Sequence, residues 1–396
     1  MAEVVLGLGR KFFPQVVKLR RHLHRYPELA FEELITGKTL AEELNNSGVK
    51  VTKGVGKTGI VGVLKGTGSA GTVALRADMD ALPIDEQSGV SFSSQSKGKM
   101  HACGHDAHMA MLIGAARILS HMRNDLRGKV IFIFQPSEEK NPGGAPGMIR
   151  DGAVSDADVI FGQHITTDLP TGRIGFHAGP MMASADELYF TIIGKGGHGA
   201  KPHDAIDPIF ISAQVITSLQ SVISRMKDPL DPSVLTIGSI HGGTATNIIP
   251  DSVKLSGTLR TMNESWRSKA LKLISSTAKQ TASSVGGRCD FTISSGYPVL
   301  VNSESETEFA RQAAQNLFGK KSVITVPAVM GAEDFAYFLR VVPGTFWWIG
   351  AGNRKMGATS SIHSSSFRID EEAMFYGSSL LAFLAIEYLR QRERDT

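Results

Sequence analysis

The chain has 396 residues, of which 42% are hydrophobic and 20% are charged, and its formal net charge is +4. This globular composition is long enough for about two or three domains, and it excludes a disordered, collagen-like or coiled-coil protein. The densest basic segment, KLRRHLHR at 18–25, has apolar residues at helical spacing, which favours a solvated helix face over a nucleic-acid partner. The sequence holds no run of about 18 apolar residues, so no membrane partner is expected.

The chain contains two cysteines, Cys103 and Cys289. Secreted chains of this size more often carry several, so a reducing, cytoplasmic location is expected. The first residues, MAEVVLGLGRKFF, have no basic residue before the short apolar stretch and no small-residue cleavage site after it. We therefore predict no signal peptide.

Helical and extended patterns alternate in the first part of the chain, 1–183. Helical patterns cover 11–47, with a break at Tyr-Pro, and 105–122, where apolar residues recur at i, i+3, i+4 and i+7. Continuous apolar runs of strand length at 128–139 and 157–165 are typical of buried parallel strands. Strands that alternate with helices predict an α/β fold with a mostly parallel sheet.

The pattern changes over 184–296, where a strand, a helix, two strands, a helix and a strand follow one another. That order is the order of a ferredoxin-like sandwich. From about residue 304 the first alternation returns, and it includes a predicted helix over 332–342. We predict a main domain, 1–183 and 297–396, that is interrupted by an inserted lid domain.

Polar residues interrupt the ends of several predicted strands. The run VALRADMD ends in Asp78 and Asp80, VIFIFQPSEE ends in Glu138 and Glu139, and VIFGQHI reaches His164. The carboxyl ends of parallel strands meet at one edge of an open α/β sheet, and ligands gather there. These side chains are therefore expected to converge.

Two further segments add candidate metal donors: HACGHD lies just before a predicted helix, and a polar loop holds ATSSIHSSSF. Imidazole and thiolate suit zinc, cobalt, nickel or manganese better than magnesium or calcium. Five candidates exceed the four ligands of one structural zinc, so a pair of ions about 3.5–4 Å apart fits better, with a shared thiolate. The candidate ligands are Cys103, His105, Glu139, His164 and His363.

Adjacent side chains at a strand end point in different directions. Glu139 can therefore bind metal while Glu138 faces water as general base and later as general acid. Other readings stay open: Cys103 as an inert core thiol, and His101 and His108 as hydrogen-bond partners or helix-surface residues. The carboxylates before Pro83 either cap a turn or orient a ligand histidine.

Ordered motifs along nearly the whole chain resemble the M20 metallopeptidase family, specifically its amidohydrolase branch of aminoacylase-like and hippurate-hydrolase-like enzymes, archaeal carboxypeptidases and plant auxin-conjugate hydrolases. The motifs are RRHLHRYPELAFEE, ALRADMDALP, HACGHDAHMAMLIGAA, IFQPSEE, FGQHI, GKGGHGAKPH, TNIIPD, GTLRT, GAEDF and HSSSF. The resemblance implies a two-metal catalytic domain with a ferredoxin-like lid. It also implies that the five candidate ligands hold two divalent ions (zinc, manganese, cobalt or nickel), with Glu138 as general base.

The resemblance implies roles for three lid residues as well. His198 looks like the histidine that reaches a partner subunit's site in related dimers and polarises the scissile carbonyl; a turn residue between glycines is the alternative. Asn247 and Arg260 look like residues that hold the substrate's oxygens or carboxylate. A homodimer or higher homo-oligomer through the lid is expected. Other branches have His-x-Asp where this chain has Asp78-Met79-Asp80, so their exact ligand roles do not carry over.

The expected function is metal-dependent hydrolysis of the amide bond of N-acyl amino acids. The nearest alternative is a metallo-exopeptidase, either a carboxypeptidase or a dipeptidase, that acts on short or N-blocked peptides. Two rivals come from other classes: a cysteine hydrolase that uses Cys103 with His105, and a non-catalytic metal-binding protein.

Overall fold

A computed structural model describes residues 1–395, which divide into two compact units. Unit 1 holds Met1–Gly179, Val301–Pro327 and the chain from Asp334 onward. Unit 2 holds Pro180–Leu300 and Ala328–Glu333. Each unit has a hydrophobic core of its own, so each is described by itself.

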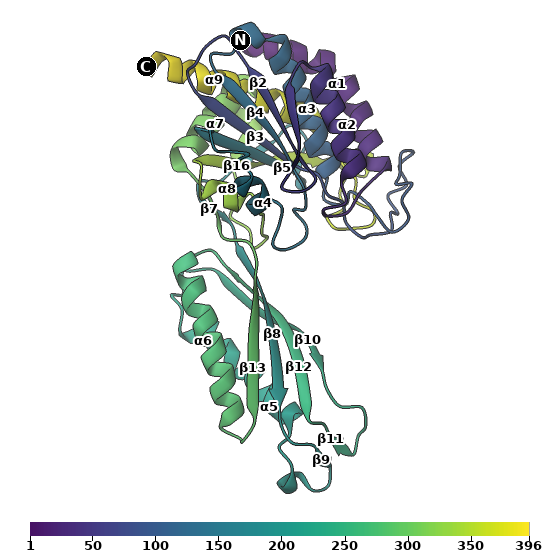
Figure 1. The fold of residues 1–396 in the computed structure, drawn as a ribbon, viewed down its shortest axis with the longest axis vertical. Helices are drawn as coiled ribbons and strands as arrows, with labels where there is room; N and C mark the ends of the chain where they lie inside the picture. Colours follow the sequence, from purple (N-terminus) through teal and green to yellow (C-terminus); the bar gives the residue numbers. More distant parts are fainter. Residues whose placement is uncertain (396) are drawn as a thin grey trace. The chain divides into compact units, whose positions relative to one another are not determined.

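Unit 1 is built on an eight-stranded sheet with the order β1-β2-β4-β3-β5-β16-β6-β15 (Figure 1). Its central neighbours β4, β3, β5 and β16 run parallel, as predicted, while β1, β2 and β6 bring antiparallel pairings. Central strands such as β3 and β4 are buried on both faces, because helices cover the sheet. The strands are β1 Lys50–Val55, β2 Gly59–Lys65, β3 Thr72–Asp78, β4 Lys129–Gln135, β5 Val159–Pro170, β6 Ile174–Phe176, β15 Val323–Thr325 and β16 Gly344–Gly352.

Helix α3 lies against strand β3 and packs between helices α1 and α9. Nearly every residue of α3 is buried, which explains why its sequence is apolar on almost every side. The helices of unit 1 are α1 Ala2–Arg25, α2 Leu34–Asn46, α3 His105–His121, α4 Ala145–Arg150, α7 Glu304–Phe318, α8 Ala336–Leu339 and α9 Ala373–Asp395, with short 3-10 turns at Arg123–Asp125, Lys320–Ser322 and Arg354–Met356.

Two predicted helices differ from the structure. The first begins at Ala2 rather than residue 11 and continues through Pro14. The helix predicted over 332–342 is limited to the single turn α8. The chain before that turn is not helical, and the Asp334 carboxylate there binds Arg76 and Gln135 in the core.

Unit 2 has the predicted ferredoxin-like fold. Its six elements follow the order strand, helix, strand, strand, helix, strand, and its antiparallel sheet has the order β10-β12-β8-β13. Both helices pack on the sheet, and each begins at a side-chain cap: Asp207 accepts from two amides of α5, and Asn263 accepts from Trp266 in α6. The elements are β8 Ser184–Ile193, α5 Pro208–Arg225, β10 Ser233–His241, β12 Ser252–Thr261, α6 Glu264–Ser283 and β13 Arg288–Ser295.

The remaining short elements of this part of the chain are β9 and β11, which pair with each other, a 3-10 turn, and two strands near the ends of the insertion. They are β9 Gly197–His198, β11 Ile248–Ile249, the turn Pro202–Asp204, β7 Gly179–Met182 and β14 Leu300–Asn302.

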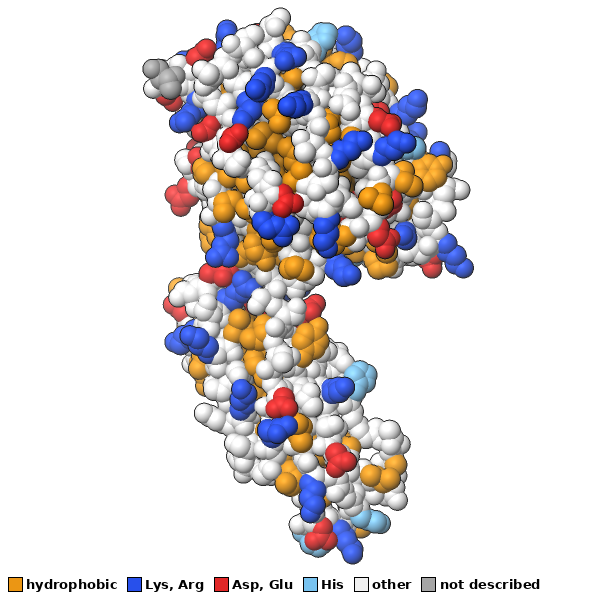
Figure 2. Space-filling view, viewed as in Figure 1, with side chains coloured by type: hydrophobic (Ala, Val, Ile, Leu, Met, Phe, Trp, Pro, Cys, Tyr) orange, Lys and Arg blue, Asp and Glu red, His pale blue; other side chains and the backbone are white. Residues whose placement is uncertain are grey.

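The surface corrects one expectation about the basic segment 18–25. Lys18, Arg21 and His22 are exposed, but Arg20 and His24 are buried. The segment is therefore a solvated face on one side and part of the core on the other. Figure 2 shows basic and acidic side chains interspersed on the visible face of each unit. Among residues 1–395, none of the helices combines the length and apolar character that a membrane span requires.

Candidate active site

The five predicted ligand residues belong to unit 1 and come from four places in its fold. Glu139 follows β4, His164 lies within β5, and His363 is in the loop after β16. Cys103 and His105 lie where the chain enters α3. Their donor atoms form overlapping groups, in each of which all donor atoms lie within 4.8 Å of one another.

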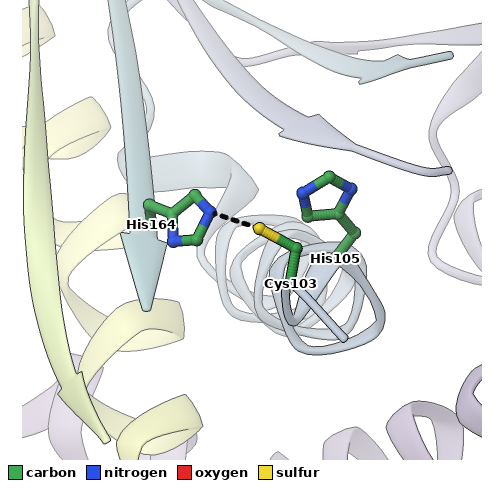
Figure 3. A group of neighbouring side chains, drawn as sticks. All are labelled: Cys103, His105 and His164. Carbon is green, nitrogen blue, oxygen red and sulfur yellow. Dashed lines mark hydrogen bonds between the residues drawn. The ribbon is translucent and has the colours of Figure 1, made fainter. Parts of the chain in front are cut away.

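The first group consists of Cys103, His105 and His164, all of which are buried. The sulfur of Cys103 lies 3.3 Å from Nε2 of His164, and Figure 3 shows these two side chains pointing toward each other, with His105 beside them. Within the described residues 1–395, Nε2 of His105 has no hydrogen-bond partner although it is buried. A buried ring nitrogen without a partner fits a position that coordinates a metal.

A second group consists of Cys103, Glu139 and His363, so Cys103 belongs to both groups. Nε2 of His363 lies 3.2 Å from a carboxylate oxygen of Glu139. The backbone amide of His363 donates to the carbonyl of Ala102 at 2.8 Å, which ties this loop to the cysteine segment. A third group joins His105 and Glu139 to Glu138, the predicted general base.

Gly104 allows the chain to turn between the two ligand candidates on either side of it. Its φ is +87°, in the left-handed region. A Cβ at this position would lie 2.3 Å from the side chain of Ile165. A larger residue here would require both a strained backbone and a shift of Ile165, the residue after His164.

Hydrogen bonds to backbone carbonyls set the ring orientations. Nδ1 of His105 donates to the carbonyl of Asp80 at 2.9 Å, and Nδ1 of His164 donates to the carbonyl of Ile165 at 2.6 Å. In both rings the proton is thereby placed on Nδ1, which leaves Nε2 with a free lone pair in the neutral form. The sequence suggested that Asp80 orients a ligand histidine, and its backbone carbonyl has that contact.

The carboxylate of Asp80 holds the turn that carries the two glutamates. One oxygen accepts from the amide of Glu138 at 2.8 Å, and the other accepts from the amide of Glu139 at 3.0 Å. Its carboxylate therefore does not cap the turn before Pro83.

His108 is a hydrogen-bond partner, one of the two roles considered for it. Its Nδ1 donates to Asp78 at 2.7 Å, and its Nε2 accepts from the amide of Ile165 at 3.0 Å. Both ring nitrogens are thus occupied, so His108 is not available as a ligand. The contact fixes the backbone directly after His164.

The buried network around Asp78, the partner of this histidine, was not predicted from the sequence. The guanidinium of Arg76 pairs with Asp78 at 2.7 Å and with Asp334 at 2.9 Å, and its Nε donates to Gln135 at 2.8 Å. A single arginine inside the apolar run of β3 was the available signal. Its partners could not be identified, because Asp334 lies far away in the sequence.

The ionisable groups make the pocket favourable for a cation. Burial raises the pKa of the Cys103 thiol well above its ordinary value, and the Glu139 carboxylate raises it further. Burial lowers the pKa of His164 well below its ordinary value. For His105 burial also opposes the charged form, but the carboxylates of Asp78, Asp80 and Glu139 together outweigh burial and raise the pKa to about 10. Without a cation, therefore, Cys103 stays a thiol beside a neutral His164.

His101 does not match either of its expected roles. It is buried rather than on a helix surface, and neither ring nitrogen has a hydrogen-bond partner within the described part of the chain. Burial lowers its pKa to about 3, so the ring is neutral.

The three predicted lid residues all belong to unit 2. His198 and Asn247 are both exposed. They lie close together, since the amide of Gly199 donates to the carbonyl of Asn247 at 2.8 Å. Nδ1 of His198 accepts from the amide of Ala200 at 3.0 Å, so the neutral ring carries its proton on Nε2. Arg260 lies on β12, is partly buried, and donates to Thr258 at 3.3 Å.

The chain is similar to known proteins over nearly its whole length. Thermostable carboxypeptidase 1 of Saccharolobus solfataricus is 40% identical over 376 residues, which cover 94% of this chain and 95% of that protein. The IAA-amino acid hydrolase ILR1-like 4 of Arabidopsis thaliana is 39% identical over 399 residues, which cover 99% of this chain and 90% of that protein.

A solved structure matches as well. The YXEP protein of Bacillus subtilis, described as a dinuclear metal-binding peptidase from the M20 family, superposes with a TM-score of 0.84 at 34% identity, covering 96% of this chain and 99% of that chain. Residues 74–387 also match the model of peptidase family M20/M25/M40. Motifs, fold and comparisons therefore lead to one conclusion: the chain belongs to peptidase family M20/M25/M40 and to the amidohydrolase branch that its motifs resemble.

Proposed function

We propose that the protein is a two-metal amidohydrolase that cleaves the amide bond of N-acyl amino acids. The observation that carries the proposal is the pair of donor groups that share Cys103 beside the acidic residue Glu138. A similar protein of known structure is described as a dinuclear metal-binding peptidase, and one relative is named as a hydrolase of IAA-amino acids.

The donors fit two divalent cations. One would be held by Cys103, His105 and His164, and the other by Cys103, Glu139 and His363. Thiolate, imidazole and carboxylate together suit zinc, manganese, cobalt or nickel. When bound, such ions supply Lewis acidity for a carbonyl group and for water.

Glu138 is proposed to move the proton. It is buried, and Asp80 holds its amide, so its position is fixed by the backbone. Glu138 takes a proton from the attacking water and returns it to the leaving nitrogen. A carboxylate in this position serves as base in the first step and as acid in the second.

The lid residues are proposed to bind the substrate. His198 is in the tautomer that offers Nε2–H as a donor, which suits a carbonyl oxygen that gains negative charge. Arg260, together with Asn247, would bind the free carboxylate of the amino acid through charge-assisted hydrogen bonds. The resemblance to the family supports these assignments.

We also propose a homodimer through unit 2. Strand β10 lies at the edge of the four-stranded sheet, and it exposes Val234 and Ile240. An unpaired edge with apolar side chains favours pairing with another chain. Sedimentation velocity of the full chain tests this, and a monomer at all concentrations would contradict it.

The second candidate is a metallo-exopeptidase, which the identity to a carboxypeptidase favours. A cysteine hydrolase that uses Cys103 with His105 is disfavoured. Burial raises the pKa of the Cys103 thiol, and the raised pKa of His105, about 10, leaves that ring protonated and unable to accept the thiol proton.

One experiment separates these functions. Protein reconstituted with manganese, cobalt, nickel or zinc is assayed on N-acetyl amino acids, hippurate and dipeptides, before and after exhaustive chelation. We expect metal-dependent hydrolysis with N-acyl amino acids preferred. Preference for dipeptides would support the exopeptidase, and full activity after chelation would exclude a metal mechanism.

A further inference from the structure

Three consecutive backbone amides in the turn after β4 donate to carboxylates. The amide of Ser137 donates to Oε1 of Glu33 at 2.9 Å, and the next two amides, those of Glu138 and Glu139, donate to Asp80. Successive amides in a turn form a concave donor surface that binds anions. Here the anionic partners are two side chains of the protein: Glu33 binds the first of the three amides, and Asp80 binds the other two.

The turn requires such support because its backbone is unusual. Ser137 has a φ of +53°, in the left-handed region that non-glycine residues rarely adopt. Backbone of this kind persists where its surroundings hold it in place. The carbonyl of Ser137 accepts from the amide of Gly144 at 2.8 Å, so both backbone groups of Ser137 are fixed.

Glu33 is itself held rigidly. It is fully buried, and its Oε2 accepts from the hydroxyl of Thr58 at 2.5 Å. Its other oxygen is the one that binds Ser137, so both oxygens are engaged. Burial raises the pKa of Glu33, despite the opposing hydrogen bond from Thr58. Glu33 ends the motif RRHLHRYPELAFEE, to which the chemistry of the site has so far assigned no role.

We propose that Glu33 is a positioning residue, which fixes Glu138 and Glu139 by holding the amide of Ser137. The inference rests on the proposed function, since it assumes that Glu138 moves a proton and Glu139 binds metal. Without Glu33, the turn keeps its contact to Asp80 but loses its first anchor. The two glutamates then sample orientations in which one or both miss the metals and the substrate.

Glu28 provides a matched control from the same segment. It is also a carboxylate in the motif, but its oxygens accept from the amides of Ile35 and Thr36 at 3.2 and 2.7 Å, in the first turn of α2. Its side chain stabilises a helix start without contributing to the proposed site. Glu28→Ala therefore reports what the loss of a structural carboxylate does by itself.

The experiment compares wild type, Glu33→Ala, Glu33→Gln and Glu28→Ala in three measurements: hydrogen exchange of the peptide that contains 136–144, affinity for cobalt, and kcat and KM on an N-acetyl amino acid. In Glu33→Ala we expect the amide hydrogens of this peptide to exchange faster than in the wild type. We also expect cobalt affinity and kcat each to fall by about 10–100-fold, with little change in KM. Glutamine keeps an acceptor for Ser137 and a partner for Thr58, so Glu33→Gln should stay close to wild type. Glu28→Ala should lower Tm but leave the exchange over 136–144, the cobalt affinity and the kinetic constants at their wild-type values.

Glu33→Ala with unchanged exchange over 136–144 and unchanged cobalt affinity would overturn the proposal, as would Glu33→Gln behaving like Glu33→Ala. If Glu33→Ala does not fold, Thr58→Val replaces it, because it frees one oxygen of Glu33. We then expect a smaller change in the same direction, and no change would count against the proposal. If wild type hydrolyses no N-acyl amino acid, the proposed function fails, but exchange and cobalt affinity still decide the role of Glu33.

Discussion

Arg20 in α1 and Asp106 in α3 form a buried ion pair, in which Nε lies 2.7 Å from Oδ2. His24, one turn further along α1, donates to the same oxygen at 2.8 Å. Asp106 directly follows the candidate ligand His105, so the pair joins the first helix to the start of the helix that carries the site. Arg20 and His24 also lower the pKa of Asp106 against the effect of burial.

Arg20→Met should strongly destabilise the protein, because it leaves Asp106 buried with His24 as its remaining cationic partner. Removing one partner of a buried pair costs about 3–5 kcal/mol in the free energy of unfolding. Arg21→Met is the control: Arg21 is about half exposed and pairs with Glu371 at 2.6 Å, so its loss should cost about 1 kcal/mol or less. Urea unfolding measures both, and equal losses would contradict the prediction.

Glu86 should make stability depend on acid pH. Burial opposes its charge, but hydrogen bonds from His24 and Ser88 lower its pKa from 4.5 to about 2. A carboxyl whose pKa is lower in the folded state contributes stability above pH 4.5 that is lost as the pH falls toward 2. In Glu86→Gln the free energy of unfolding should therefore be reduced at neutral pH, with a shallower decline below pH 4.5. Parallel acid profiles for the two proteins would contradict this.

His108→Ala should weaken metal binding although His108 is not a candidate ligand. The substitution removes the imidazole ring that connects the carboxylate of Asp78 to the backbone amide of Ile165, the residue after His164. Loss of a group that orients a ligand typically costs about 10–100-fold in metal affinity. Cobalt titration measures the effect, with the exposed His121→Ala in the same helix as the control. Identical affinities would show that His164 needs no such support.

Cys103→Ser should change metal content more than a substitution at any other candidate ligand. Cys103 is the member common to the two donor groups, so its loss affects both proposed ions. We expect elemental analysis to find two metal ions per chain in the wild type and one or fewer in Cys103→Ser. His363→Ala, which belongs to one group, should retain one ion. If Cys103→Ser still binds two metal ions per chain, the proposal that both ions share Cys103 is wrong.

Glu138→Gln should separate proton transfer from metal binding. The amide cannot act as a base, so kcat should fall by about 10²–10⁴-fold. The metal content should stay at the wild-type level, because the ligand assigned to this turn is Glu139. Undiminished turnover would exclude Glu138 as the general base, while a loss of both ions would assign it to metal binding instead.

The sequence predicted those parts of the fold that depend on local periodicity. The alternation of apolar runs and helical patterns indicated the parallel sheet, and the change of pattern at 184–296 indicated the ferredoxin-like insertion. Strand-end positions indicated Glu139 and His164, and the segments HACGHD and ATSSIHSSSF indicated the other donors that meet in unit 1. These features arise from residues close together in the chain.

Contacts between distant segments could not be predicted in this way. Glu33 binds the amide of Ser137, 104 residues away, and a glutamate before a helix gives no sign of that partner. The burial of Arg20 was missed for the same reason, because its basic neighbours suggested a solvated face. The helix over 332–342 was overpredicted, since helical spacing does not reveal that Asp334 turns toward Arg76.

The chain enters and leaves the ferredoxin-like unit at the same end. Strand β8 begins the unit and β13 closes it, and in their pairing Asp186 lies opposite Ser295. Because these two strand ends are neighbours, the path of the chain through this fold begins and ends at adjacent points. Under the proposed function, the residues that would bind the substrate are thus encoded in one continuous segment of the chain, apart from the five candidate metal ligands.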